Sequence, residues 1–74
     1  AYDNGDMTAA RTAFASATAR NPDYAEAWAW LGRVAFEQKL YADAAVSYGR
    51  ALALDPGNDT YSWFKRESER LQGG

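Results

Sequence analysis

The sequence predicts an all-α fold that consists of four helices. Sixteen of its 74 residues are Ala, two are Val and none is Ile. This composition favours helix over sheet, because Ala loses no rotamer freedom in a helix whereas sheets prefer β-branched residues. Turn-forming clusters of Asn, Asp, Pro and Gly separate segments of helix length. An internal repeat with a period of 34 residues also indicates paired helices.

The repeat is visible in residues of several kinds. The identical pairs at this offset are Ala10 and Ala44, Ala17 and Ala51, Ala19 and Ala53, and Pro22 and Pro56, while Phe14 with Tyr48 and Asn21 with Asp55 are close substitutions. Chance rarely aligns small, aromatic and Pro positions together. The period is therefore typical of a protein whose structural units stack side by side.

The first helix is expected from about Met7 to Arg20. Asn4-Gly5-Asp6 before it is a predicted turn in which Asp6 is the N-cap. The helix is expected to end before Asn21-Pro22, because a residue that precedes Pro is disfavoured in the α conformation. Its apolar face is expected to consist of Ala10, Ala13, Phe14 and Ala17.

The second helix is expected from about Tyr24 to Gln38. Asp23 followed by Glu26 has the spacing of a capping box, which satisfies free amide groups at a helix start. The 100° step per residue places one stripe on the buried side: Tyr24, Trp28, Leu31, Gly32 and Ala35. Gly costs about 1 kcal/mol relative to Ala inside a helix, so Gly32 predicts a neighbouring helix close against its backbone.

A bend at Lys39 and Leu40 is expected to lead into a third helix from about Tyr41 to Leu54, with these residues on its buried side: Tyr41, Ala44, Ala45, Tyr48, Ala51 and Leu52. That helix stops before Asp55-Pro56-Gly57-Asn58, and either Asn58 or Asp59 is expected to cap a fourth helix, from about Thr60 to Leu71. One arc of the fourth helix contains Tyr61, Trp63, Phe64 and Leu71, and the opposite arc contains Ser62, Lys65, Arg66 and Glu69.

Composition excludes several classes of function. Eight Lys and Arg against ten Asp and Glu leave a net charge of −2, so the chain has no basic field for nucleic acid. The absence of Cys and His excludes disulfides, thiol nucleophiles, Cys/His zinc sites and an imidazole base, and leaves the compartment unassigned. Its apolar runs are far shorter than the roughly 20 residues that cross a bilayer, so no membrane insertion is expected.

No catalytic or cofactor site is predicted. The carboxylates of Glu26, Glu37, Glu67 and Glu69 lie apart on polar faces, and no Ser or Thr has a basic partner that would activate it. The loop from Asp55 to Asp59 is rich in oxygen ligands but lacks the spacing and the terminal Glu of an EF-hand. We therefore expect no metal, no cofactor and no enzymatic activity.

The chain resembles the tetratricopeptide repeat family. The residues at positions typical of the family are Ala10, Phe14, Ala17, Pro22, Trp28, Leu31, Gly32, Ala44, Tyr48, Ala51 and Pro56. Ala35 departs from the family, which usually has Tyr there. The resemblance implies antiparallel helical hairpins in a fragment of an α-solenoid, organised as one TPR-like domain over residues 1–74.

The resemblance also implies how the domain is divided. Residues 1–24 resemble the back of one repeat, 25–58 form a complete repeat, and 59–74 resemble the C-terminal capping helix of an array. Ser62, Lys65 and Arg66 stand where a further repeat would have Trp, Leu and Gly. Because about three repeats are needed for a stable stack, the chain is expected to belong to a longer array or to form a homo-oligomer.

The family binds extended peptides or partner helices on its concave face, which implies a protein or peptide partner here. The expected binding residues are Glu26, Trp30, Arg33, Phe36, Glu37, Trp63 and Glu67. Trp and Arg are common interface anchors. The family's clamp for peptide carboxylates is reduced to Arg33, so a more apolar ligand is favoured.

Two functions remain open at this point. The first is a scaffold that binds a peptide or partner helix through this face. The second is a structural or self-association element at the C-terminal end of a longer array, with no ligand of its own. In that second case Trp30 packs against Trp63 or a neighbouring repeat.

Overall fold

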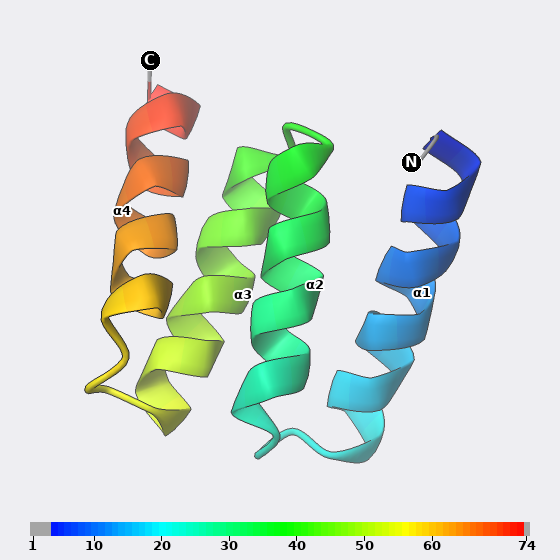
Figure 1. The fold of residues 1–74 in the computed structure, drawn as a ribbon, viewed down its shortest axis with the longest axis horizontal. Coiled ribbons are helices and arrows are strands. Elements are labelled where there is room, and N and C mark those ends of the chain that lie inside the picture. Colours follow the sequence, from blue (N-terminus) through cyan, green and yellow to red (C-terminus); the bar gives the residue numbers. More distant parts are fainter. Residues whose placement is uncertain (1–3, 74) are drawn as a thin grey trace.

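The computed structural model describes residues 4–73, which form four helices and no strand. They are α1 (Asn4–Arg20), α2 (Ala25–Glu37), α3 (Tyr41–Leu54) and α4 (Asp59–Gly73). Figure 1 shows the helices side by side in chain order, each antiparallel to the next. The all-α prediction is confirmed. None of these helices has the length and apolar character needed to cross a bilayer.

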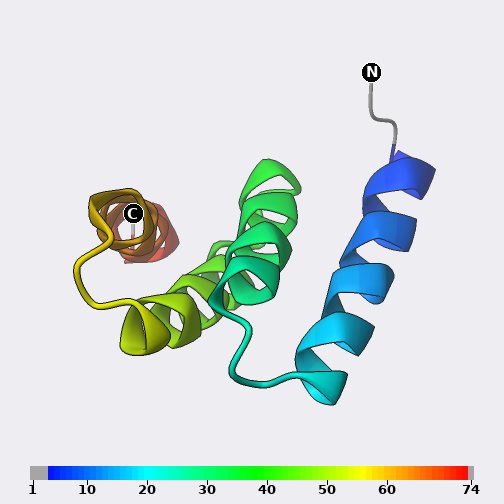
Figure 2. The same cartoon turned by 60° about the horizontal axis from the view of Figure 1, so that its bottom comes forward.

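The helices form two layers. α3 packs against both α2 and α4, and α1 packs against α2. Figure 2 shows α2 and α4 on one side of the molecule with α3 below and between them. The extents of 33 × 32 × 18 Å fit this arrangement, because two packed helices lie about 8–10 Å apart. Consecutive helices therefore pack closely against one another.

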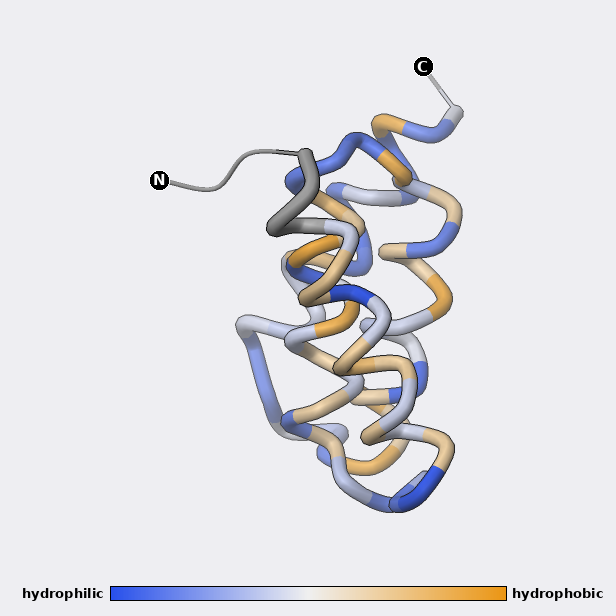
Figure 3. The backbone as a smooth tube through the Cα atoms, turned by 90° about the vertical axis from the view of Figure 1, so that its right-hand side faces the viewer, coloured by the Kyte–Doolittle hydropathy of each residue, from blue (hydrophilic) through white to orange (hydrophobic). Residues whose placement is uncertain are grey.

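The core is built mainly from small residues around one aromatic ring. Tyr48 is 2% exposed, and the other buried apolar residues are Ala27, Val34, Ala35, Ala44 and Ala51. Figure 3 shows apolar and hydrophilic segments that alternate along the helices. This pattern follows from the 3.6-residue period, which returns a small apolar residue to the same face at each turn. Ala side chains let the helices approach closely.

The start of α1 differs from the prediction. Asn4, Gly5 and Asp6 were expected to form a turn with Asp6 as the N-cap, but their backbone is helical. Because these residues are helical, their carbonyl groups can accept hydrogen bonds from the backbone amides one turn later. The end of α1 at Arg20 agrees with the prediction.

The start of α2 also corrects the prediction. The N-cap is Tyr24, with no side-chain cap hydrogen bond, so the box of Asp23 and Glu26 does not form. A box needs its two members at the N-cap and N3 positions, and this register places both one position too early. The backbone is held instead by the indole of Trp28, whose Nε1 donates to the carbonyl oxygen of Pro22 over 2.8 Å. The guanidinium of Arg50 lies 5.8 Å from the centre of the same indole.

The turn between α2 and α3 has a conformation that the sequence did not reveal. Lys39 has a φ of 64°, in the left-handed region. Its amide donates to the carbonyl of Phe36 over 3.0 Å, and the amide of Leu40 donates to the carbonyl of Ala35 over 2.8 Å. These two bonds form a Schellman motif with Lys39 at the position that Gly usually occupies. α3 then has the predicted bounds.

Asn58 is the residue that caps α4. Its Oδ1 accepts the amide of Tyr61 over 3.1 Å, and its Nδ2 donates to Asp55 Oδ2 over 3.2 Å. The first bond satisfies one of the free amides at the helix start. Of the two expected caps, Asn58 is therefore the observed one, and Asp59 is the first residue of α4.

The buried stripes are partly as predicted. Gly32, Ala35, Ala44, Tyr48 and Ala51 are buried, and Trp28 and Leu31 are partly buried. Trp63, which was expected among the binding residues, is 50% exposed on α4. The prediction was wrong for Tyr24, which is 50% exposed where the chain turns into α2. It missed Ala27 and Val34 on α2, Ser47 on α3 and Ser68 on α4, which are buried. Small side chains fit there where neighbouring helices pack closely, and among residues 4–73 the Ser68 hydroxyl has no hydrogen-bond partner.

Candidate functional site

A hollow of about 200 Å³ lies between α2 and α4, with α3 behind it. We call it the α2–α4 hollow, and its lining residues are Glu26, Ala29, Trp30, Arg33, Tyr48, Thr60, Tyr61 and Phe64. α2 and α4 each pack on α3, and the hollow lies between them. Residues from three helices thus meet at one opening.

Aromatic rings form the floor of the α2–α4 hollow. Tyr48 and Phe64 are stacked, with ring centres 4.8 Å apart and planes 6° from parallel, and Tyr61 lies 6.2 Å from Tyr48. Phe36 meets Phe64 edge to face at 5.3 Å, and Trp63 meets it in the same way at 5.0 Å. Such pairs add about 0.5–1.5 kcal/mol beyond burial of their area. The floor is therefore well ordered.

Trp30 stands at the rim of this hollow. Its side chain is 52% exposed, although its ring stacks on Phe14 of α1 with centres 6.1 Å apart. Among the ring contacts of the described residues, Trp30 meets Phe14 and not Trp63. The Phe14 contact restricts the indole, so its open area is presented in a defined position.

The charges around the hollow are unevenly paired. Arg33 Nε donates to Glu37 Oε1 over 3.0 Å, and the Arg33 guanidinium lies 5.7 Å from the centre of the Phe64 ring. Glu67 is held by Arg70, with an ion pair of 2.7 Å, and this hydrogen bonding lowers the pKa of Glu67. Glu26 has no ion-pair partner among the described residues. In the lining of the hollow, the charge of Arg33 is therefore neutralised by Glu37, whereas the carboxylate of Glu26 has no ion-pair partner among the described residues.

The two Tyr hydroxyls in the lining titrate abnormally. Burial raises the pKa of Tyr48 to about 12, and the nearby Arg33 opposes this increase. The pKa of Tyr61 is also raised, first by burial and then by the carboxylates of Asp55 and Glu26. Both hydroxyls are therefore neutral at physiological pH, and that of Tyr61 lies in a negative field.

The structure gathers part of the predicted binding set. Glu26, Trp30 and Arg33 line the hollow, while Phe36 supports its floor and Glu37 holds Arg33. Trp63 and Glu67 lie on α4 outside the lining. The sequence placed Tyr48 on the buried side of α3 and Tyr61 and Phe64 on one arc of α4, but it did not indicate that these three residues line an opening. The helical spacing shows which face of α3 or α4 each residue lies on. The opening between α2 and α4 depends on how the helices pack together, which the spacing does not reveal.

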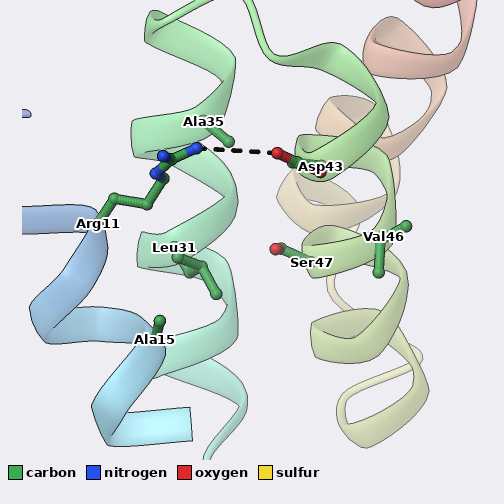
Figure 4. Close-up of a pocket in the computed structure, with 7 residues that line it drawn as sticks. All are labelled: Arg11, Ala15, Leu31, Ala35, Asp43, Val46 and Ser47. Atoms are coloured by element: carbon green, nitrogen blue, oxygen red, sulfur yellow. Dashed lines mark ion pairs between the residues drawn. The ribbon is translucent and has the colours of Figure 1, made fainter. Parts of the chain in front are cut away.

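A second hollow, of about 290 Å³, lies on the other side of α2, between α1 and α3. Figure 4 shows its lining, with an ion pair from Arg11 to Asp43 across the opening. The two charged groups are 3.8 Å apart and largely solvated, so the pair contributes about 1 kcal/mol or less. The remaining lining is small and mostly apolar: Ala15, Leu31, Ala35, Val46 and Ser47. It offers no group that anchors a ligand.

The described residues contain no cluster of three or more carboxylates suited to a metal ion. In the loop before α4, the side chains of Asp55 and Asn58 are used in the hydrogen bonds that begin that helix. The oxygen-rich character of this loop thus has a structural explanation. The site consists of rings, one ion pair and one free carboxylate, which is suited to binding.

Comparison with known proteins identifies one family. A model of the tetratricopeptide repeat family matches residues 1–59, which is most of the chain. Neither the curated proteins nor the solved structures provide a match. The matched region includes α1 to α3 and the turn that leads into α4.

Proposed function

Because this chain belongs to the tetratricopeptide repeat family, which generally provides protein–protein interaction scaffolds, we propose that it binds a peptide or partner helix in the α2–α4 hollow. Domains of this family are typically non-catalytic, and we propose the same for this chain. The observation that carries the proposal is Trp30, a half-exposed indole beside a ring-lined opening. Trp is the residue most enriched among the energetic anchors of interfaces.

The size of the hollow supports a protein partner. About 200 Å³ is smaller than the roughly 300–1,000 Å³ of pockets that enclose a small molecule. It suits one side chain of a peptide or helix, with the rest of the partner on the surface around it. In this proposal Trp63, Glu37 and Glu67 contact the partner at the edges, and Glu26, Trp30, Arg33 and Phe36 form the centre.

The division of the chain into repeats is part of the same proposal. Residues 25–58 correspond to one complete repeat that contains α2 and α3, residues 1–24 to part of a preceding repeat, and residues 59–74 to a capping helix. In this division, the α2–α4 hollow lies between α2, the first helix of the complete repeat, and α4, the capping helix after that repeat. This is the concave side of a helical stack.

A selection from a random peptide library tests the function. The library is selected on the immobilised wild-type chain alone, and the affinities of the selected peptides for the wild type and its variants are measured by Trp fluorescence. We expect Trp30→Ala to weaken binding by about 2 kcal/mol, with helical circular dichroism nearly unchanged. Tyr24→Ala is the matched control, since Tyr24 is 50% exposed and outside the hollow. Equal losses in both variants, or loss of the fold in Trp30→Ala, would overturn the proposal.

The contact between Phe14 and Trp30 favours a second candidate, a self-association or purely structural role. The Phe14 and Trp30 rings are stacked with centres 6.1 Å apart, so Phe14 covers part of the indole within the chain, and α1 packs mainly against α2. In this case a second copy covers the exposed part of the pair. Light scattering over a wide concentration range would show a dimer or larger species, and Phe14→Glu would disperse it. A monomer at every concentration would exclude this candidate.

A further inference from the structure

The α2–α4 hollow has an acidic end. Of the two charged residues in its lining, Arg33 is neutralised by Glu37 at 3.0 Å, while Glu26 has no ion pair among residues 4–73. Glu26 lies two turns before Arg33 on the same face of α2. A partner that enters the hollow therefore meets a free carboxylate near the start of α2 and a satisfied ion pair further along.

Nearby groups strengthen this polarity. Burial raises the pKa of Tyr61 in the lining, and the carboxylates of Asp55 and Glu26 raise it further. Two cations on the neighbouring helices have contacts of their own: Lys65 pairs with Glu69 at 2.9 Å, and Arg50 lies over the indole of Trp28. No ion pair among residues 4–73 neutralises Glu26 itself.

Aromatic surface lies beside the free carboxylate. Trp30 follows Glu26 by four residues, so the two side chains are neighbours on one face of α2. Trp is the best aromatic acceptor for a Lys or Arg head group, and its ring also covers the apolar stem of such a side chain. A carboxylate beside an exposed indole complements both parts of a basic side chain.

We propose that the α2–α4 hollow selects its partner through an Arg or Lys side chain, whose head group pairs with Glu26 and whose stem lies against Trp30. The inference rests on the proposed function and adds the chemistry of the partner. An acidic side chain is disfavoured, because Arg33 already has a carboxylate and Glu26 would repel a second one. A neutral apolar side chain would leave Glu26 unpaired beneath it.

Four blocked alanine pentapeptides test this inference, with Arg, citrulline, Lys or Glu at the centre. Citrulline has the shape of Arg without its charge. Each peptide is titrated into the whole chain, and the NMR signal of the Trp30 indole is followed after assignment with Trp30→Phe. We expect the Arg and Lys peptides to bind at least about fivefold more tightly than the citrulline and Glu peptides. Added salt should reduce this difference.

Glu26→Gln should abolish the preference for Arg over citrulline. Asp43→Asn is the control, because Asp43 also lies in the first turn of its helix and loses the same charge, but lines the other hollow. Equal affinity for Arg and citrulline, or a preference that survives Glu26→Gln, would overturn the inference. In that event, library peptides that still depend on Trp30 would leave the proposed function standing. If neither these four peptides nor any library peptide shifts the Trp30 signal, both proposals fail.

Discussion

Gly32 on α2 lies directly against the ring of Tyr48 on α3. A Cβ atom added to Gly32 would be 2.7 Å from Cδ2 and 2.8 Å from Cε2 of that ring, which is closer than such atoms can approach. The close helix approach that the mid-helix glycine predicted is therefore confirmed. The same ring stacks on Phe64, so the absence of a side chain at Gly32 also determines where the floor of the α2–α4 hollow lies.

Gly32→Ala should destabilise the fold. The added methyl group forces Tyr48 to move within a packed core, which typically costs about 1–3 kcal/mol, and the better helix propensity of Ala returns up to about 1 kcal/mol. We expect a net loss of about 0.5–2 kcal/mol in the free energy of unfolding, measured with urea. Gly57→Ala is the control, because nothing lies within 4 Å of a Cβ there. A Gly32→Ala variant as stable as the wild type would contradict the close contact.

Lys39→Gly should stabilise the fold. The left-handed conformation at Lys39 costs a side-chain-bearing residue about 1–2 kcal/mol, whereas Gly adopts it freely but loses about 0.5–1 kcal/mol of backbone entropy. The expected gain is about 0.5–1 kcal/mol, seen as a higher midpoint of thermal unfolding. Lys39→Ala keeps a Cβ atom and should change little. A glycine variant no more stable than the alanine variant would show that this turn is not strained.

Asn58→Ala and Asp23→Ala should differ in effect. Asn58 donates and accepts hydrogen bonds at the start of α4, and loss of an N-cap costs about 1 kcal/mol. Asp23 makes no cap bond at α2, so its replacement should cost less than about 0.5 kcal/mol. Denaturant unfolding of the two variants compares them directly. A larger loss of stability in Asp23→Ala than in Asn58→Ala would indicate that the predicted capping box of Asp23 and Glu26 does form.

Alkaline pH should destabilise the chain through Tyr48. Its pKa rises from about 10 in the unfolded chain to about 12 in the fold, so the unfolded state loses the proton first. The contribution of Tyr48 to stability is complete below pH 10 and is lost as pH rises toward 12, by about 1.4 kcal/mol per pH unit. Tyr48→Phe keeps the ring and should show a shallower decline. Parallel pH profiles for the two proteins would contradict this assignment.

The candidate site could be predicted only in part. Glu26, Trp30 and Arg33 were found because the helical period places them opposite the buried stripe of α2. Tyr61 and Phe64 were placed on one arc of α4, and only the tertiary structure shows that they line an opening beside α2. Trp63 was expected among the binding residues and is half exposed, but it lies outside the lining of the hollow.

The sequence by itself determined the helices, their order and the repeat. These depend on interactions between residues close in the chain: the helix propensity of Ala, the breaks at Pro22 and Pro56, and the period that gathers Ala44, Tyr48 and Ala51 on one face. The tertiary structure decided which surfaces remain open. The choice of Asn58 as a cap, the stack of Phe14 on Trp30 and the hollow between α2 and α4 depend on where separate helices lie in space. A periodic pattern gives each helix a direction to bury, but the distance to its neighbours is set by the side chains that meet there, as Gly32 and Tyr48 show.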